Sequence, residues 1–136
     1  MRINQYFIQI VIIGMGGFVG AVLRFIISTH VQQMNKGLFF PWGTLTVNLL
    51  GCLIMGLLMQ LNESCHLFSP EIKSFIFIGM LGSLTTYSTF SNDALNLIIE
   101  HRYMASTIYM TTQLLLGLFA VFAGRLISQF IVLRML

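Results

Sequence analysis

The sequence predicts an all-α integral membrane protein with four transmembrane helices. Hydrophobic residues make up 57% of the 136 residues and charged residues only 8%, whereas about 25% of the residues of a soluble domain are charged. The apolar residues gather in four runs, at residues 5–29, 43–61, 72–99 and 104–133. Each run is long enough to cross a hydrocarbon core as a helix. We therefore expect residues 1–136 to form one four-helix membrane domain.

The polar residues exclude several other classes of protein. The seven basic residues lie singly along the chain and form no patch that could follow a phosphate backbone, so no nucleic-acid partner is expected. Cys52 and Cys65 are too few for a metal motif, and no two histidines stand at ligand spacing. No nucleophile–base pair stands out, so we do not expect an enzyme.

The first run carries small residues on one helix face. Gly16 and Gly20 form a small-xxx-small pair, which predicts close contact with another helix. Arg24 lies one turn beyond Gly20, on the same face. Its guanidinium could extend to the lipid headgroups, or it could guard the mouth of an anion path.

The second run contains an amide inside an apolar span. Thr44, Asn48 and Cys52 recur at every fourth position and share one helix face. An intramembrane amide is unfavourable unless it has a hydrogen-bonding partner. Asn48 could donate a hydrogen bond to an anion, or it could join two helices.

The third run changes character near its middle, where glycines and hydroxyl side chains replace apolar ones between Gly79 and Ser91. Glycine and adjacent β-branched threonines weaken a helix, which predicts a break near Gly82–Thr86. Lipid does not tolerate free carbonyl groups, so such a break must be buried in protein or line a cavity. Unwound carbonyls there are suitable ligands for Na⁺. An unbroken helix packed through its small residues is the equally weighted alternative.

Two aromatic residues follow the expected break. Tyr87 and Phe90 are three positions apart and therefore share a helix face. The edge of an aromatic ring carries partial positive charge, so a pair of ring edges could stabilise a passing anion. Packing alone is the simpler explanation for such a pair.

The fourth run carries a polar stripe on an apolar helix. Tyr109, Gln113 and Gly117 step by four residues, and Thr111 and Thr112 lie between them. The stripe indicates a wet or protein-facing side of this helix, without showing which residue faces a path.

The balance of charges bears on orientation in the membrane. With four spans, both ends of the chain would lie on one side. The Lys and Arg residues then divide almost evenly between the two sides. The terminal side has Arg2, Lys73, Arg125 and Arg134, and the other side has Lys36, Arg102 and Arg24. The positive-inside rule therefore gives little bias. The chain could insert both ways and pair as an antiparallel dimer, or a small bias could still fix one orientation.

Four stretches of the chain resemble the CrcB (Fluc) family of fluoride channels. They are residues 17–24, residues 43–51, residues 79–93 and the glycine-marked last helix. The resemblance covers nearly the whole chain, and its most specific parts are GTLTVNLLG at residues 43–51 and TTYSTFS at residues 85–91.

The resemblance implies a dual-topology antiparallel dimer with two fluoride pores in the inner (plasma) membrane. It also implies a structural Na⁺ at the dimer centre, held by the backbone carbonyls of Gly82 and Thr85. Asn48, Tyr87 and Phe90 would line the fluoride path, and Arg24 would lie in its vestibule. Two residues depart from the usual family pattern: Tyr87 replaces a phenylalanine, and Asp93 replaces a glutamate. Since some members form heterodimers with a paralogue, the first departure leaves homodimer and heterodimer both open.

Two other functions compete with this interpretation. A small multidrug-type transporter also has four short helices and can insert both ways, but it needs a membrane-embedded carboxylate. Asp93 is the only acidic residue within a span, and it lies toward the end of the third. A non-conducting partner subunit is the second alternative.

Overall fold

The computed structural model describes residues 2–37 and 39–135, and every element in this part of the chain is helical. Three helices are long: α1 (Arg2–Met34), α2 (Trp42–Cys65) and α6 (Tyr103–Met135). Within the described residues, these three are long and apolar enough to cross a membrane. The expected all-helical membrane protein is confirmed at this level, and the helices extend a few residues beyond the predicted apolar runs.

The third apolar run forms four consecutive helical segments. These are α3 (Pro70–Lys73), the π-helix η1 (Ser74–Leu81), α4 (Gly82–Leu84) and α5 (Tyr87–Ile99). The start follows from local chemistry, because Pro70 occupies a first-turn position and the Ser69 hydroxyl accepts the Ile72 N–H at 3.4 Å. The π-helix was not predicted, since a wider helical turn leaves no clear pattern in an apolar sequence.

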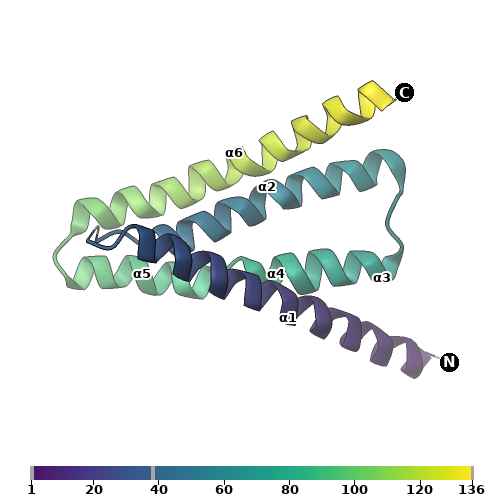
Figure 1. The fold of residues 1–136 in the computed structure, drawn as a ribbon, viewed down its shortest axis with the longest axis horizontal. Coiled ribbons are helices and arrows are strands. Elements are labelled where there is room, and N and C mark those ends of the chain that lie inside the picture. The colour runs from purple at the N-terminus through teal and green to yellow at the C-terminus, as the bar shows by residue number, and fades with distance from the viewer. Residues whose placement is uncertain (1, 38, 136) are drawn as a thin grey trace.

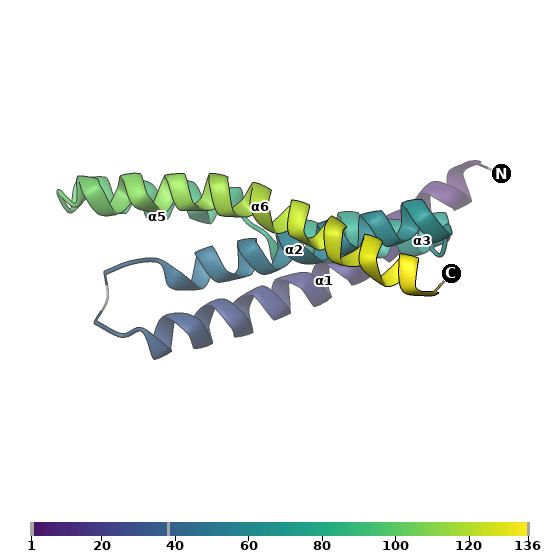
Figure 2. The same ribbon diagram turned by 90° about the horizontal axis from the view of Figure 1, so that it is seen from above.

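The helices form an elongated bundle in which segments that follow one another along the chain run in opposite directions, so that α2 and α6 run side by side in the same direction. The start of α1, the end of α6 and the α2–α3 connection lie at one end of the bundle, as Figure 1 shows. The α1–α2 and α5–α6 connections lie at the other end. Viewed from above in Figure 2, α5 and the first half of α6 diverge from α1 and α2 toward this second end.

Glycines allow the closest approaches between helices. A Cβ atom on Gly20 of α1 would overlap the Met80 carbonyl oxygen of η1 and the Ser83 hydroxyl of α4. A Cβ atom on Gly56 of α2 would overlap the Val121 carbonyl oxygen of α6. The predicted role of the first-run glycines in close helix contact is therefore confirmed. Such contacts matter in lipid, where helices associate through close packing rather than through the hydrophobic effect.

Within the part of the chain that the structure describes, one cluster of buried apolar residues forms a small core. It consists of Leu45, Ala94, Leu97 and Tyr109, with partly buried neighbours such as Phe90. Many large apolar side chains point outward instead, for example Phe18 at 72% exposure and Leu114 at 65%. A protein with an apolar exterior needs lipid or another protein chain around it.

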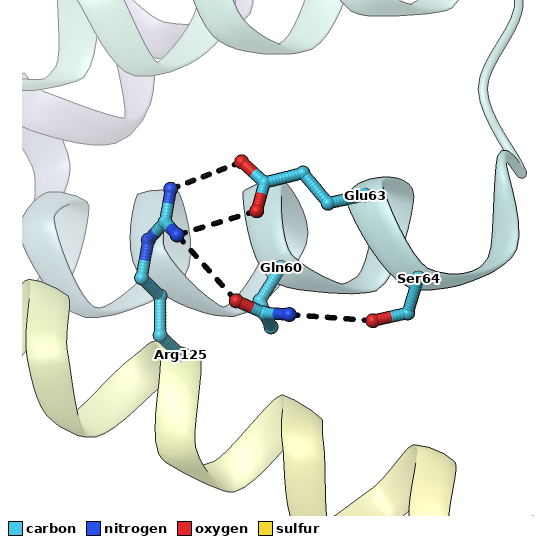
Figure 3. Close-up of polar contacts among 4 residues, drawn as sticks. All are labelled: Gln60, Glu63, Ser64 and Arg125. Carbon is cyan, nitrogen blue, oxygen red and sulfur yellow. Dashed lines mark hydrogen bonds and ion pairs between the residues drawn. The ribbon is translucent and has the colours of Figure 1, made fainter.

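Polar side chains tie the helices together at the two ends of the bundle. At the terminal end, the Arg125 guanidinium of α6 donates two hydrogen bonds to the Glu63 carboxylate of α2, at 3.0 and 3.2 Å, and a third, at 3.5 Å, to Gln60 (Figure 3). At the opposite end, the Gln32 carboxamide donates to the Phe40 carbonyl at 3.2 Å and accepts from the Gly43 N–H at 3.1 Å. The second pair of bonds fixes the α1–α2 connection against α1.

Replacing Gly20 with alanine should separate α1 from the third run. The new methyl group would overlap the Met80 carbonyl, and overpacking of this kind reduces stability by about 1–3 kcal/mol. Gly14→Ala is the matched control, because a Cβ atom at Gly14 meets no atom within 4 Å. Unfolding in a mixed-micelle titration, followed by Trp42 fluorescence, measures both. Equal stability of the two variants would contradict the close contact.

Candidate functional site

The helical path is interrupted between α4 and α5. Helix α4 ends at Leu84, and Thr85 and Thr86 then have extended backbone angles, with φ, ψ of −82°, 154° and −149°, 119°. Thr86 caps α5, because its hydroxyl oxygen accepts the Thr89 N–H at 3.3 Å. A threonine pair suits this place, since β-branched residues favour extended backbone and the hydroxyl satisfies a helix N–H.

The side chain of Asn48 satisfies the backbone of the interrupted segment. Its Oδ1 accepts the Thr86 N–H at 2.8 Å, and its Nδ2 donates to the Thr86 carbonyl at 3.2 Å. The Thr86 N–H can only donate, so it fixes which end of the Asn48 amide faces it. Asn48 therefore acts as a two-point clamp from α2 onto the third run.

The clamp changes the hydrogen bonding of the two carbonyls predicted to hold Na⁺. In a continuous α-helix the Gly82 and Thr85 carbonyls would accept the N–H groups of Thr86 and Thr89. Here the Thr86 N–H donates to Asn48, and the Thr89 N–H donates to the Thr86 hydroxyl. Gly82 is exposed on the surface of the chain, and Thr85 is half-buried. Within the described residues, no group of three or more His, Cys, Asp or Glu side chains could hold a metal ion.

The two predicted aromatic residues lie next to each other just beyond the interruption. The Tyr87 and Phe90 ring centroids are 5.7 Å apart, with the rings tilted by 52°. Phe90 also packs against Tyr109 at 5.4 Å, whereas Tyr87 is 81% exposed. One ring therefore borders the core and the other faces away from this chain.

A chain of polar side chains connects the clamp with a carboxylate on α5. The Asn48 Nδ2 donates to Gln113 Oε1 at 3.3 Å, and the Gln113 Nε2 donates to the Tyr109 hydroxyl oxygen at 3.4 Å. The Tyr109 hydroxyl donates to Asp93 Oδ2 at 3.3 Å, and the Thr44 hydroxyl donates to the same oxygen at 2.7 Å. Three helices thus contribute to one partly buried network.

The network ends at the wall of an open cavity of about 660 Å³. Thr44 and Asp93 line the cavity together with polar residues of α1, the α1–α2 connection, α5 and its C-cap, among them Ser28, Gln32, Lys36, Asn96 and Glu100. Arg24 lies half-buried on α1, one turn before Ser28, and is outside this lining. The structure therefore brings Asn48, Phe90 and the interrupted segment together and leaves Arg24 apart from the cavity.

The polar stripe of the fourth run divides between two neighbours. Tyr109 and Gln113 join the network, whereas Gly117 faces α2, where an added Cβ atom would meet Cys52 Sγ at 3.8 Å. Sequence reasoning did not predict the bonds to Asp93. The sequence contains one indication of these bonds. Thr44 is one turn before Asn48 on its helix, and Tyr109 is one turn before Gln113 on its own, so each pair shares a helix face.

Comparison with known proteins decides the family. The sequence profile described as "CrcB-like protein, Camphor Resistance (CrcB)" matches residues 11–125. The chain belongs to the CrcB family. The matched range runs from α1 to α6 and includes the clamp, the aromatic pair and the whole polar network.

Curated CrcB-family relatives match most of the chain. A protein of Shewanella baltica (strain OS185) named "Fluoride-specific ion channel FluC" is 43% identical over 117 residues, which cover 86% of this chain and 93% of the relative. "Fluoride-specific ion channel FluC 1" of Methanosarcina acetivorans is also 43% identical, over 86% of this chain and 88% of the relative. "Fluoride-specific ion channel FluC" of Shewanella sp. (strain ANA-3) is 41% identical, over 86% of this chain and 93% of the relative.

The clamp can be tested in this CrcB-family chain by replacing Asn48 with leucine. The change leaves the Thr86 N–H and carbonyl without partners, and each unsatisfied buried group reduces stability by about 1–3 kcal/mol. We expect a loss of about 2–4 kcal/mol in unfolding free energy and faster hydrogen exchange at the Thr86 amide. Asn35→Leu is the control, because Asn35 makes one bond, to Val31 at the end of α1. Similar losses in both variants would rule out the clamp.

Proposed function

We propose that this chain is the subunit of a fluoride-specific ion channel of the cell's inner membrane, and that it is not an enzyme. The observation that carries the proposal is the 43% identity, over 86% of the chain, to proteins named as fluoride-specific ion channels. Membership of the CrcB family and three long apolar helices support it. The channel lets fluoride leave the cell and so lowers its internal concentration.

The geometry supports an anion path along the interrupted segment. Fluoride holds its water strongly, so a path must replace that water with other hydrogen-bond donors. A full positive charge would hold the ion too firmly, whereas neutral donors such as the Asn48 amide and the edges of the Tyr87 and Phe90 rings bind it more weakly. The positive charge of Arg24, on α1 outside the cavity lining, increases the local concentration of anions in the vestibule of the fluoride path.

Passive conduction is sufficient for export. A membrane potential that is negative inside drives an anion outward, and it contributes about 2.3 kcal/mol per elementary charge for each 100 mV. The channel therefore needs no coupled ion and no chemical step. This distinguishes it from the multidrug-type transporter, in which a carboxylate must exchange protons. Here Asp93 already accepts two hydrogen bonds, from Thr44 and Tyr109.

The third run would supply the remaining membrane crossing. At 1.5 Å per residue, a helical path over residues 70–99 is long enough for a hydrocarbon core of about 30 Å. The interruption at Thr85–Thr86 then lies inside the membrane. Backbone at that depth is tolerated only where protein or a water-filled path surrounds it. The exposure of Gly82 and Tyr87 in one chain is consistent with a second subunit covering them.

The channel that we propose is an antiparallel dimer of two copies in opposite orientations, with one path on each side. The near balance of Lys and Arg residues allows both orientations, and a C-terminal reporter should therefore be found on both sides of the membrane. Pairing with a paralogue is the alternative form of the same assembly. A heterodimer would account for Tyr87, which replaces the phenylalanine that is usual in the family.

A structural Na⁺ fits between the two copies. The carbonyls of Gly82 and Thr85 have lost their usual helical donors to the clamp and the cap. Two copies would bring four such oxygens together, and Na⁺ is a hard cation that prefers oxygen ligands. The ion would neutralise the converging carbonyl dipoles and hold the two interrupted segments together.

The function is tested by fluoride efflux from liposomes that contain only this chain. The wild-type protein should release fluoride and retain chloride. Phe90→Ile should lose most of the flux while the dimer still assembles, because the new side chain is apolar but has no ring edge. Tyr87→Phe should keep or raise the flux.

Phe119→Ile is the control for the loss of a ring, since Phe119 lies on α6 with 65% of its surface exposed. Size-exclusion chromatography checks the assembly of every variant. An inert wild-type chain would favour the non-conducting partner subunit. Normal flux in Phe90→Ile would show that the Phe90 ring serves only to pack the core.

The Na⁺ proposal predicts that sodium stabilises the dimer. Exchanging sodium for N-methylglucamine at constant ionic strength should lower the unfolding temperature. A ligand present at one hundred times its dissociation constant contributes about 2.7 kcal/mol to stability. The monomer, isolated at high detergent concentration, is the control and should respond to neither cation. Identical unfolding temperatures of the dimer in both salts would exclude a bound sodium ion.

A further inference from the structure

The side chain of Gln113 lies between the clamp and the cavity carboxylate. It is half-buried on α6, and its carboxamide accepts from Asn48 at one end and donates to the Tyr109 hydroxyl oxygen at the other. Both contacts are long, at 3.3 and 3.4 Å. Neutral N–H···O hydrogen bonds usually measure about 2.7–3.2 Å, so both contacts are weak ones.

The orientation of this carboxamide is determined from both ends. The Thr86 N–H requires Asn48 Oδ1 as its acceptor, so Asn48 Nδ2 points a proton toward Gln113. At the other end, the Asp93 carboxylate takes the only Tyr109 hydroxyl proton, so the Tyr109 oxygen must accept. Both ends require that Gln113 present its oxygen to Asn48 and its NH₂ group to Tyr109.

The two amide protons of Asn48 serve different purposes. One donates to the Thr86 carbonyl and completes the clamp. The other donates to Gln113 and adds nothing to the clamp, because the two bonds to Thr86 already fix the Asn48 amide. This second proton is therefore the one that Asn48 can give to an anion without disturbing the interrupted helix.

We propose that Gln113 is a specificity-determining positioning residue, whose side-chain oxygen holds the second Asn48 proton until fluoride displaces it. A small anion accepts a stronger hydrogen bond than a neutral amide oxygen, so fluoride can replace Gln113. A larger anion with more diffuse charge accepts more weakly and gains little by the exchange. The inference rests on the proposed fluoride function and assigns to Gln113 the selection of the ion at that site.

Two substitutions at Gln113 should move fluoride conduction in opposite directions. Gln113→Met keeps the length of the side chain but removes the competing oxygen, so the fluoride concentration at half-maximal flux should fall by about threefold to tenfold, and chloride flux should rise. Gln113→Glu puts a charged acceptor on the Asn48 proton, so the same concentration should rise by at least as much. A role confined to packing would not give opposite signs.

Tyr109→Phe is a second route to the same result, because it leaves Gln113 in place but removes the oxygen that holds its NH₂ group. It should shift the half-maximal concentration in the direction of Gln113→Met. Gln60→Met is the matched control, since it makes the same chemical change at the terminal end of α2, and it should match the wild type.

The measurement is fluoride and chloride efflux from liposomes over a range of anion concentrations, with unfolding temperature recorded for each variant. The inference is supported when the methionine and glutamate variants differ in sign. It is overturned when the wild type conducts but Gln113→Met is unchanged, or when both variants shift the same way, or when Tyr109→Phe opposes Gln113→Met. A wild-type chain that carries no fluoride overturns the proposed function and this inference with it.

Discussion

A buried backbone that leaves its helix must find its hydrogen-bond partners inside the protein, and the Asn48 carboxamide supplies them here. It pairs with both the N–H and the carbonyl of Thr86. Because these bonds come from α2, they fix where the third run stops being helical and where α5 begins. The position of the Gly82 and Thr85 carbonyls and of the Phe90 ring follows from that one contact.

The central position of α2 depends on glycine contacts in turn. Helix α2 packs mainly on α6 and also contacts α1 and the η1, α4 and α5 parts of the third run. Gly56 lets α2 lie against the α6 backbone at Val121, which brings Asn48 and Gln113 within hydrogen-bond distance further along the same pair of helices. Gly20 likewise allows α1 to lie against the backbone of the third run at Met80. Since lipid supplies little drive for helix association, this close packing has to hold the polar network together.

The sequence was sufficient for the all-helical membrane class, the glycine contacts and the pairing of Tyr87 with Phe90. Each depends on spacing along one helix, or on composition. It left two roles open for Asn48, and the structure shows the amide joining helices, through one proton to Thr86 of the third run and through the other to Gln113 of α6. Spacing could not reveal the link to Asp93, because the register between helices is a tertiary property. The π-helix was missed for a related reason, since side-chain type hardly distinguishes it from an α-helix.

The position of Asn48 in the sequence also determines when the clamp can form during synthesis of the chain. Asn48 precedes Thr86 by 38 residues, so a ribosome has already delivered α2 to the membrane when the interrupted segment emerges. The irregular peptide can then pair at once with an amide that is already in place, before α6 or a second copy exists. Biogenesis would be harder with the amide on a later helix, because the nascent chain would hold unpaired backbone in lipid until that helix arrived. In the proposed topology, in which the third run crosses the bilayer, a single asparagine upstream of the segment that it completes thus makes vectorial insertion compatible with a non-helical peptide.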